Sequence, residues 1–176
     1  EYWGSYWKKF TFPMSFIGFL IEKYILLYYE NFIVISEKGK RDIEKISKGN
    51  IALIYNGINL KLIEGIKTKK SANFIYFGRL EDHKRVDRGI EVFSELIKLN
   101  PKYTFQIIGD GSCKEQLELL VRKKNLTNRI FFTGRLDDDH EMYALIKGAD
   151  CMLFFGTQEG GGSITLLEAN ACGIPV

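Results

Sequence analysis

Hydrophobic residues in the second half of the chain recur in a strand-then-helix order. Four short apolar runs are separated by segments in which apolar side chains return every three or four residues, the spacing of an amphipathic helix. The candidate strands are Asn73–Phe77, Tyr103–Ile108, Ile130–Thr133 and Cys151–Phe155. This alternation predicts an α/β fold, a Rossmann-like parallel sheet with helices on both faces. Right-handed crossovers would bring the carboxyl ends of the strands to one edge, where ligands usually bind.

The first third of the chain has a different pattern. Residues 14–29 predict an aromatic-rich helix. Two short strands, Phe32–Ser36 and Ile51–Tyr55, are predicted on either side of a polar helix over Glu37–Lys48. Aromatic side chains are dense in residues 3–32, with few charges to cover them. We expect this segment either to pack on a preceding domain or to touch a membrane surface.

A domain boundary is predicted near residue 56, because Asn56-Gly57 is a strong turn signal after the second short strand. Residues 1–56 are then the end of a preceding domain, and residues 57–176 are an incomplete Rossmann-like domain. The lysine-rich stretch 61–71 fits a surface connection. The chain starts without Met and ends in mid-pattern, so we expect a fragment truncated at both ends.

Composition narrows the classes of function. The 176 residues are 45% hydrophobic, which excludes a disordered chain, and the net charge of +3 does not suggest a nucleic-acid partner. The apolar stretch Phe10–Ile21 is interrupted and too short to cross a bilayer. Three scattered cysteines without metal-ligand spacing predict reduced, buried thiols and a cytoplasmic protein.

A pair of cations follows the first strand of the second half. Arg79 and Lys84 could converge on a diphosphate, the first as a bidentate fork and the second as a point charge. The alternative is a pair of solvated surface cations.

Glycine-containing loops follow the next two strands. Gly109 and Gly111 would either let a base or ribose approach the backbone or make a tight strand-to-helix turn. Gly134-Arg135-Leu136 after the third strand has the same two interpretations. Asp137–Asp139 could suggest a metal site, but acidic residues are also favoured in a first helical turn. We expect no metal site.

The strongest segment runs from Gln158 to Val176. Three consecutive glycines, Gly160–Gly162, precede a predicted helix whose unpaired N–H groups would cradle a phosphate. Glu159 and Glu168 lie on either side of this cradle, and carboxylates accept hydrogen bonds from sugar hydroxyls. For Glu168 the alternative is a capping box with Thr165, in which the carboxylate binds its own helix end.

Six pieces of the chain, in order, resemble motifs of glycosyltransferase family 4, the retaining GT-B enzymes. The resemblance runs from about Phe32 to Val176. The pieces are Ile35-Ser36-Glu37 ("vSe"), Ile54-Tyr55-Asn56-Gly57-Ile58 ("vipNGvd"), Gly78-Arg79-Leu80 with Lys84 ("GRLxxxKG"), Ile107-Ile108-Gly109-Asp110-Gly111 ("iiGdG"), Phe132-Thr133-Gly134-Arg135 ("ftGrv") and Leu167–Val176 ("lEAmAcGtPV").

The resemblance implies a role for each loop. Arg79 and Lys84 would hold the donor diphosphate, Glu168 the ribose hydroxyls, and Glu159 the transferred sugar. The loops at Gly109, Gly111, Arg135 and Leu136 would frame the base. The segment passing under the sugar and phosphates would comprise Gly160, Gly161, Gly162, Ser163, Ile164, Thr165 and Leu166.

The sequence departs from the family pattern at two places. Glu159 and Glu168 are nine positions apart, whereas the family's paired glutamates are eight apart. Arg85 replaces the usual glycine after the lysine, where it could contact phosphate or merely start a helix.

By this resemblance the protein is expected to be a retaining hexosyltransferase. It would move a sugar from a UDP- or GDP-sugar to a glycan or glycolipid acceptor, without an obligatory cofactor or metal, in the cytoplasm or on the inner face of the membrane. The piece alone would be inactive, because the acceptor site belongs to the first domain. A GT-B sugar-nucleotide epimerase or hydrolase and a non-catalytic nucleotide-binding module stay open as alternatives.

Overall fold

The computed structural model describes residues 11–156 and 163–176, which fall into two compact units. Residues up to Gly57 belong to the first unit, and Ile58–Gly156 with Ile164–Val176 form the second. This division lies next to the boundary predicted near residue 56. That the first unit is the end of an acceptor-side domain stays a prediction.

The first unit is a small parallel α/β arrangement. Strand β1 (Asn31–Val34) pairs in parallel with β2 (Asn50–Leu53), and helix α2 (Glu37–Glu44) connects them. The Ser36 side chain caps α2 by accepting a hydrogen bond from the Gly39 N–H at 3.0 Å. The helix was predicted to reach Lys48, but it ends at Glu44, because the following residues form a turn.

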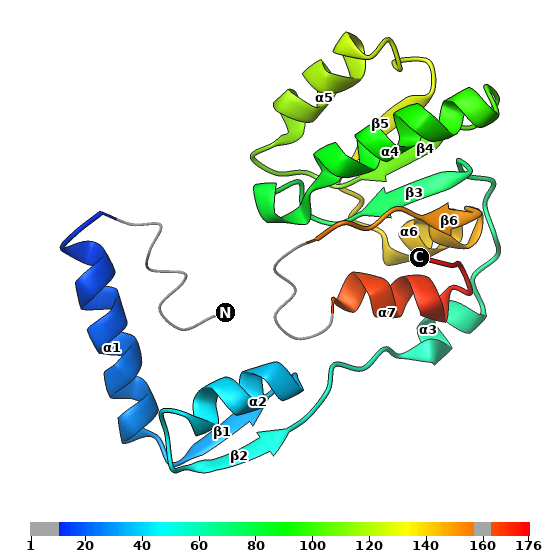
Figure 1. Ribbon diagram of the computed structural model, residues 1–176. Helices are drawn as coiled ribbons and strands as arrows, with labels where there is room; N and C mark the ends of the chain where they lie inside the picture. The colour runs from blue at the N-terminus through cyan, green and yellow to red at the C-terminus, as the bar shows by residue number, and fades with distance from the viewer. Residues whose placement is uncertain (1–10, 157–162) are drawn as a thin grey trace. The chain divides into compact units, whose positions relative to one another are not determined.

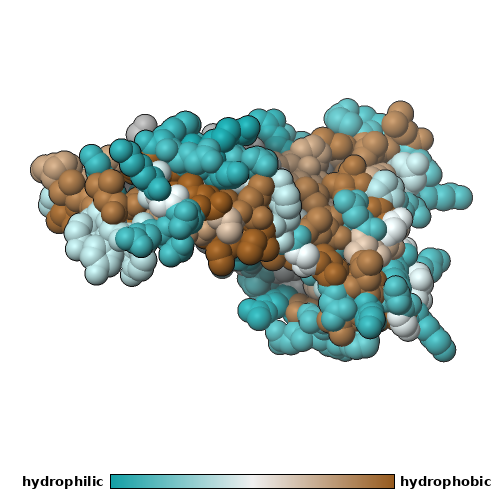
Figure 2. Space-filling view, turned by 90° about the horizontal axis from the view of Figure 1, so that it is seen from below, coloured by the Kyte–Doolittle hydropathy of each residue, from teal (hydrophilic) through white to brown (hydrophobic). Residues whose placement is uncertain are grey.

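Helix α1 (Met14–Tyr28) has few buried apolar side chains among the residues that the structure describes. Leu26 packs in the core of the first unit, whereas Phe16 and Tyr24 are 53% and 65% exposed. Figure 2 shows one face of the molecule, on which hydrophobic (brown) side chains are exposed. Among the described residues, no helix has the length and apolar character needed to cross a membrane. That a preceding domain or a membrane surface covers α1 stays a prediction.

The second unit contains a four-stranded parallel sheet in the order β5-β4-β3-β6 (Figure 1). Its strands are β3 (Phe74–Phe77), β4 (Phe105–Ile108), β5 (Ile130–Gly134) and β6 (Cys151–Met152). β6 is shorter than predicted, since its ladder with β3 spans only two residue pairs. The predicted parallel Rossmann-like sheet is confirmed.

Helices cover both faces of this sheet, as the sequence predicts. They are α3 (Leu60–Glu64), α4 (Val86–Leu99), α5 (Lys114–Lys123), α6 (Asp139–Lys147) and α7 (Ile164–Ala171). Alternate residues of β3 point to opposite faces. Tyr76 packs with side chains of α4 and α5, whereas Ile75 and Phe77 pack with those of α3, α6 and α7. Figure 1 shows the two layers on either side of the sheet.

The stretch 61–71, predicted as a surface connection, includes most of α3, which is docked on the sheet. Asn59 caps α3 by accepting from the Lys61 N–H at 3.2 Å, and Ile63 is buried in the core. The Lys147 ammonium of α6 donates to the carbonyls of Ile63 and Ile66 at 2.5 and 3.0 Å. Part of the predicted connection is therefore helical, and Asn59, a residue type favoured at the start of a helix, is the sequence signal that could have indicated it.

Candidate functional site

Three loops at the carboxyl ends of β3, β4 and β5 lie side by side. The Gly78 N–H donates to the Ile108 carbonyl at 3.0 Å, and the Gly109 N–H donates to the Gly134 carbonyl at 2.8 Å. Two residues further along the first and second loops, the Leu80 N–H donates to the Asp110 carbonyl at 2.9 Å. The predicted loops therefore form one continuous row of backbone at the edge of the sheet.

Glycine is required in this row because the backbones nearly touch. A Cβ atom on Gly109 would lie 1.9 Å from the Gly78 carbonyl oxygen, and one on Gly111 would lie 2.5 Å from the Leu80 carbonyl oxygen. Gly109 also has a φ of +144°, which residues with a side chain rarely adopt. The tight-turn interpretation thus accounts for these glycines, and their contact with a base stays a prediction.

The first loop presents the two predicted cations. Its backbone is fixed where the Tyr76 hydroxyl donates to the Arg79 carbonyl at 2.9 Å. The Arg79 side chain is exposed directly after β3, and Lys84 is half-buried at the end of a short 3-10 helix, Asp82–Lys84. Both cations therefore belong to the loop that leaves the carboxyl end of the central strand β3.

A side-chain link joins this loop to the next. The Ser112 hydroxyl donates to Glu81 Oε2 at 2.8 Å. That bond, with a backbone bond and the positive charge of Arg79, lowers the pKa of Glu81. In the second loop, Asp110 accepts from the Lys114 ammonium at 3.0 Å and from the Gly111 N–H at 2.8 Å, and these bonds lower its pKa. Both carboxyl groups thus favour their charged form, and each holds its loop in shape.

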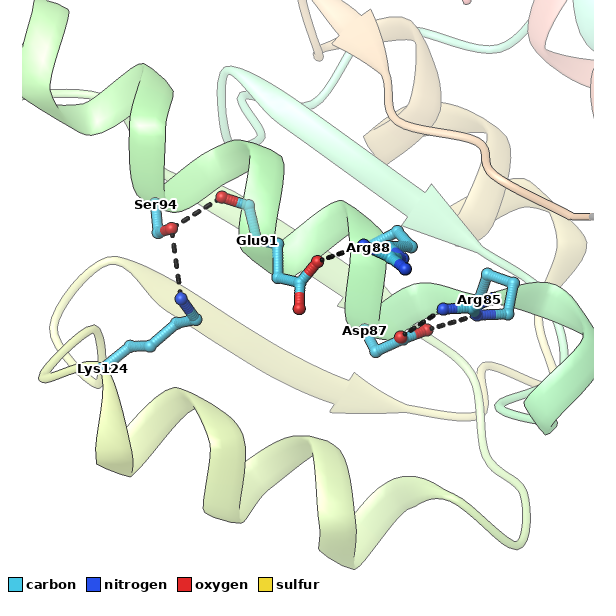
Figure 3. Close-up of polar contacts among 6 residues, drawn as sticks. All are labelled: Arg85, Asp87, Arg88, Glu91, Ser94 and Lys124. Atoms are coloured by element: carbon cyan, nitrogen blue, oxygen red, sulfur yellow. Dashed lines mark hydrogen bonds and ion pairs between the residues drawn. The ribbon is translucent and has the colours of Figure 1, made fainter.

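Arg85 starts α4 in a left-handed conformation, with φ 51° and ψ 42°. Glycine adopts this conformation without strain, which explains the glycine that the family pattern has here. Figure 3 shows the Arg85 guanidinium paired with Asp87, with its Nε and Nη2 donating at 3.1 and 2.9 Å. The structure therefore gives Arg85 a role in starting the helix.

The loop after β5 is more open. The Arg135 side chain is exposed and donates to Asp137 at 3.1 Å, while Leu136 packs partly into the core. Asp138 caps α6 by accepting from the His140 N–H at 2.9 Å. In residues 11–156 and 163–176, no group of three histidine, cysteine or acidic side chains is placed to hold a metal ion.

The start of α7 lies beside the first loop. Ser163 immediately precedes the helix and is buried, and α7 begins at Ile164. A Cβ atom on Gly78 would lie 4.0 Å from Thr165 Oγ1, so the first turn of α7, which includes Leu166, belongs to the same edge of the sheet. The predicted residues Glu159, Gly160, Gly161 and Gly162 lie outside the described residues.

Glu168 does not form the capping box that was its alternative. A capping box needs Thr165 just before the helix, but α7 already includes it. Instead, the Tyr143 hydroxyl of α6 donates to Glu168 Oε1 at 2.9 Å. Burial raises the pKa of Glu168, the bond from Tyr143 opposes this rise, and the charge of Asp139 adds to it. Glu168 is thus a half-buried carboxylate with a defined partner.

Sequence reasoning missed Tyr143 and described the cysteines only in part. Tyr143 is 25 positions from Glu168 and on another helix, so no local pattern links the two.

Cys113, Cys151 and Cys172 are free thiols as predicted, but all three are half-buried rather than fully buried. Burial raises the pKa of Cys172 to about 11.

Comparison with known proteins places the chain in a family. Residues 61–176 match the family described as "Glycosyl transferases group 1". The chain belongs to this glycosyltransferase family. The match covers the four-stranded sheet and the row of loops at its edge. This part of the chain carries the predicted site.

Curated relatives of the chain are also glycosyltransferases. The lipopolysaccharide 1,6-galactosyltransferase of Salmonella typhimurium is 28% identical over 98% of this chain and 49% of its own length. An uncharacterized glycosyltransferase of Methanocaldococcus jannaschii is 31% identical over 73% of this chain and 34% of its own. The chain thus spans between a third and a half of these relatives.

Solved structures of glycosyltransferases share the fold. TarM of S. aureus, crystallised with fondaparinux, alpha-GlcNAc-glycerol and UDP, matches with a TM-score of 0.74 at 24% identity, over 88% of this chain and 31% of TarM. The lipopolysaccharide outer core galactosyltransferase WaaB matches with a TM-score of 0.62 at 26% identity, over 84% of this chain and 42% of WaaB. The α/β architecture is therefore that of GT-B glycosyltransferases.

Proposed function

We propose that this chain carries the donor-binding half of a retaining glycosyltransferase of family 4. The reaction would transfer a hexose from a nucleotide-diphosphate sugar to a glycan or lipid-linked acceptor. The observation that carries the proposal is the clustering of the Gly78, Gly109 and Gly134 loops at one sheet edge, with Thr165 of α7 beside them. Membership of the glycosyltransferase family gives this edge its chemistry.

In this proposal the leaving diphosphate is stabilised without a metal. Arg79 and Lys84 would supply positive charge, and the first turn of α7 would supply N–H groups and the positive end of a helix dipole. Groups held in place before the reaction stabilise charge that develops in the transition state, because they need not reorganise. The hydrogen bonds at Tyr76 and Glu81 hold the Arg79 loop in this way.

The nucleoside would lie across the row of loops. The Glu168 carboxylate would accept hydrogen bonds from the ribose hydroxyls, and the backbone near Gly109, Gly111 and Arg135 would border the base. Glu159 would contact the transferred sugar. Relatives support a nucleotide-sugar donor without fixing the base, because one is a GDP-mannose-dependent mannosyltransferase and TarM was crystallised with UDP.

Calorimetric titration of UDP, GDP and pyrophosphate into the chain tests the proposal. We expect saturable binding of at least one nucleotide, unchanged when a chelator such as EDTA is added. The proposal is wrong if neither nucleotide binds, and its metal-free form is wrong if binding needs a divalent cation. In a transfer assay, the anomeric configuration of the product, determined by NMR, tests retention.

A lipid-linked acceptor would place the reaction at the inner face of the membrane. The exposed apolar side chains of α1, including Phe16 and Tyr24, support this extension of the proposal. Sedimentation with lipid vesicles tests it: we expect binding that falls when both residues are replaced by Ser. Equal sedimentation of both proteins, or none of either, would contradict membrane contact through these two side chains.

A further inference from the structure

Glu168 is held by a residue from a different helix. The Tyr143 hydroxyl on α6 donates a 2.9 Å hydrogen bond to Glu168 Oε1 on α7. Tyr143 is 9% exposed, and Ala169, next to Glu168, is completely buried against the same cluster of core residues. The donor and the backbone that carries the acceptor are therefore both fixed by packing.

The direction of this bond is defined by chemistry. Burial, followed by the bond to Glu168, raises the pKa of Tyr143, so its hydroxyl keeps its proton and can only donate to the carboxylate. A carboxylate has two oxygen atoms, each able to accept more than one hydrogen bond. One oxygen is occupied by Tyr143, and the bond fixes the orientation of the second, Oε2.

Three effects act on the pKa of Glu168, and they act in opposite directions. Burial disfavours the Glu168 carboxylate, and the negative charge of Asp139, one turn before Tyr143 on α6, disfavours it further. The bond from Tyr143 is the contact that favours the charged form. Tyr143 thus does two things for this side chain: it sets its orientation and supports its charge.

The location of the pair connects it to the proposed site. Glu168 lies one turn after Thr165, so both residues are on the same side of α7. Thr165 adjoins Gly78 at the edge where the loops meet. A ribose bound at this edge would need an oriented, ionised acceptor, because a misplaced or protonated carboxyl group would lose hydrogen bonds to both hydroxyls.

We propose that Tyr143 is a positioning residue for nucleotide recognition, acting through Glu168 on the ribose hydroxyls of the donor. This inference rests on the proposed function, in which Glu168 binds the ribose. Tyr143 itself does not touch the nucleotide. It selects for ribose over deoxyribose by keeping the Glu168 carboxylate charged and aimed.

The test compares Tyr143→Phe with wild type by calorimetric titration of UDP, or GDP if that is the nucleotide bound, and of its 2′,3′-dideoxy analogue. We expect Tyr143→Phe to weaken binding of the ribonucleotide by roughly five- to tenfold. Binding of the dideoxy analogue and of pyrophosphate should stay the same. Tyr103→Phe, a control that removes a hydroxyl from a ring packed on Phe74, should change none of these affinities.

A double-variant cycle separates positioning from a general effect on the fold. In a Glu168→Ala background, adding Tyr143→Phe should cause no further loss of affinity, since Tyr143 acts through Glu168. Equal weakening of ribonucleotide and dideoxy analogue, or no weakening of either, overturns the inference. If Glu168→Ala itself leaves ribonucleotide affinity unchanged, the ribose role of Glu168 fails, and if wild type binds neither UDP nor GDP, the proposed function fails as well.

Discussion

Replacing Gly109 by Ala should destabilise the second unit severely. The added Cβ would lie 1.9 Å from the Gly78 carbonyl oxygen, where carbon and oxygen need more than 3 Å, so two adjacent loops must move apart. That movement endangers the Gly78–Ile108 and Gly109–Gly134 hydrogen bonds, each worth about 1 kcal/mol. Alanine at a φ of +144° costs about 1–3 kcal/mol more. We expect a total loss of about 3–5 kcal/mol in the free energy of unfolding.

Gly134→Ala is the matched control. Gly134 also has a positive φ, +77°, but a Cβ there would meet nothing within 4 Å. Only the backbone penalty of about 1–2 kcal/mol should remain. Urea unfolding followed by far-UV circular dichroism measures both variants. Equal losses, or a smaller loss for Gly109→Ala, would refute the explanation that close approach of the loops requires glycine.

Three further predictions follow from contacts at or near the site. Burial raises the pKa of Glu168, so the folding stability of the wild type falls as the pH rises from the ordinary carboxyl pKa to the raised value. Glu168→Gln should therefore have a higher melting temperature than wild type at neutral pH, and the difference should disappear below the ordinary carboxyl pKa. A lower melting temperature of this variant at neutral pH would contradict the raised pKa of Glu168. Lys147→Met should lower the free energy of unfolding in urea by about 1–3 kcal/mol, because it removes the donor to the Ile63 and Ile66 carbonyls. An unchanged unfolding midpoint would show that water replaces the lysine as the donor. With a pKa of about 11, Cys172 should react slowly with iodoacetamide at neutral pH and faster as the pH rises toward 11, as peptide mapping can measure; rapid labelling at neutral pH would exclude the raised pKa.

The sequence pattern predicted the features that depend on neighbouring residues in the chain, namely the strands and the loops after them. Apolar runs and helical spacing gave the four strands of the main sheet in order, with errors only at their ends. Glycines after the strands marked the loops because strand-to-helix turns need unusual backbone angles. The end of β6 was overestimated, because apolar residues beyond Met152 pack in the core without forming ladder pairs.

Features that depend on distant contacts were not predictable. The bond from Tyr143 to Glu168 arises only when α6 and α7 pack on the same face of the sheet. The capping-box alternative for Glu168 came from a correct local spacing, but it needs a helix that starts after Thr165, whereas α7 already starts at Ile164. Arg85 was left open between a phosphate contact and the start of a helix, and only the structure shows its left-handed conformation at the start of α4 and its bond to Asp87.

In the proposed function, the edge of the sheet at Arg79 binds a nucleoside diphosphate. Titration calorimetry of UDP and GDP against Arg79→Ala tests it most directly. Arg88→Ala is the matched control, because Arg88 is an exposed arginine on α4 that pairs with Glu91 at 3.0 Å (Figure 3). We expect Arg79→Ala to lower nucleotide affinity roughly ten- to a hundredfold through loss of a charge-assisted contact, with Arg88→Ala equal to wild type. Nucleotide binding by Arg79→Ala as tight as wild type would contradict the account.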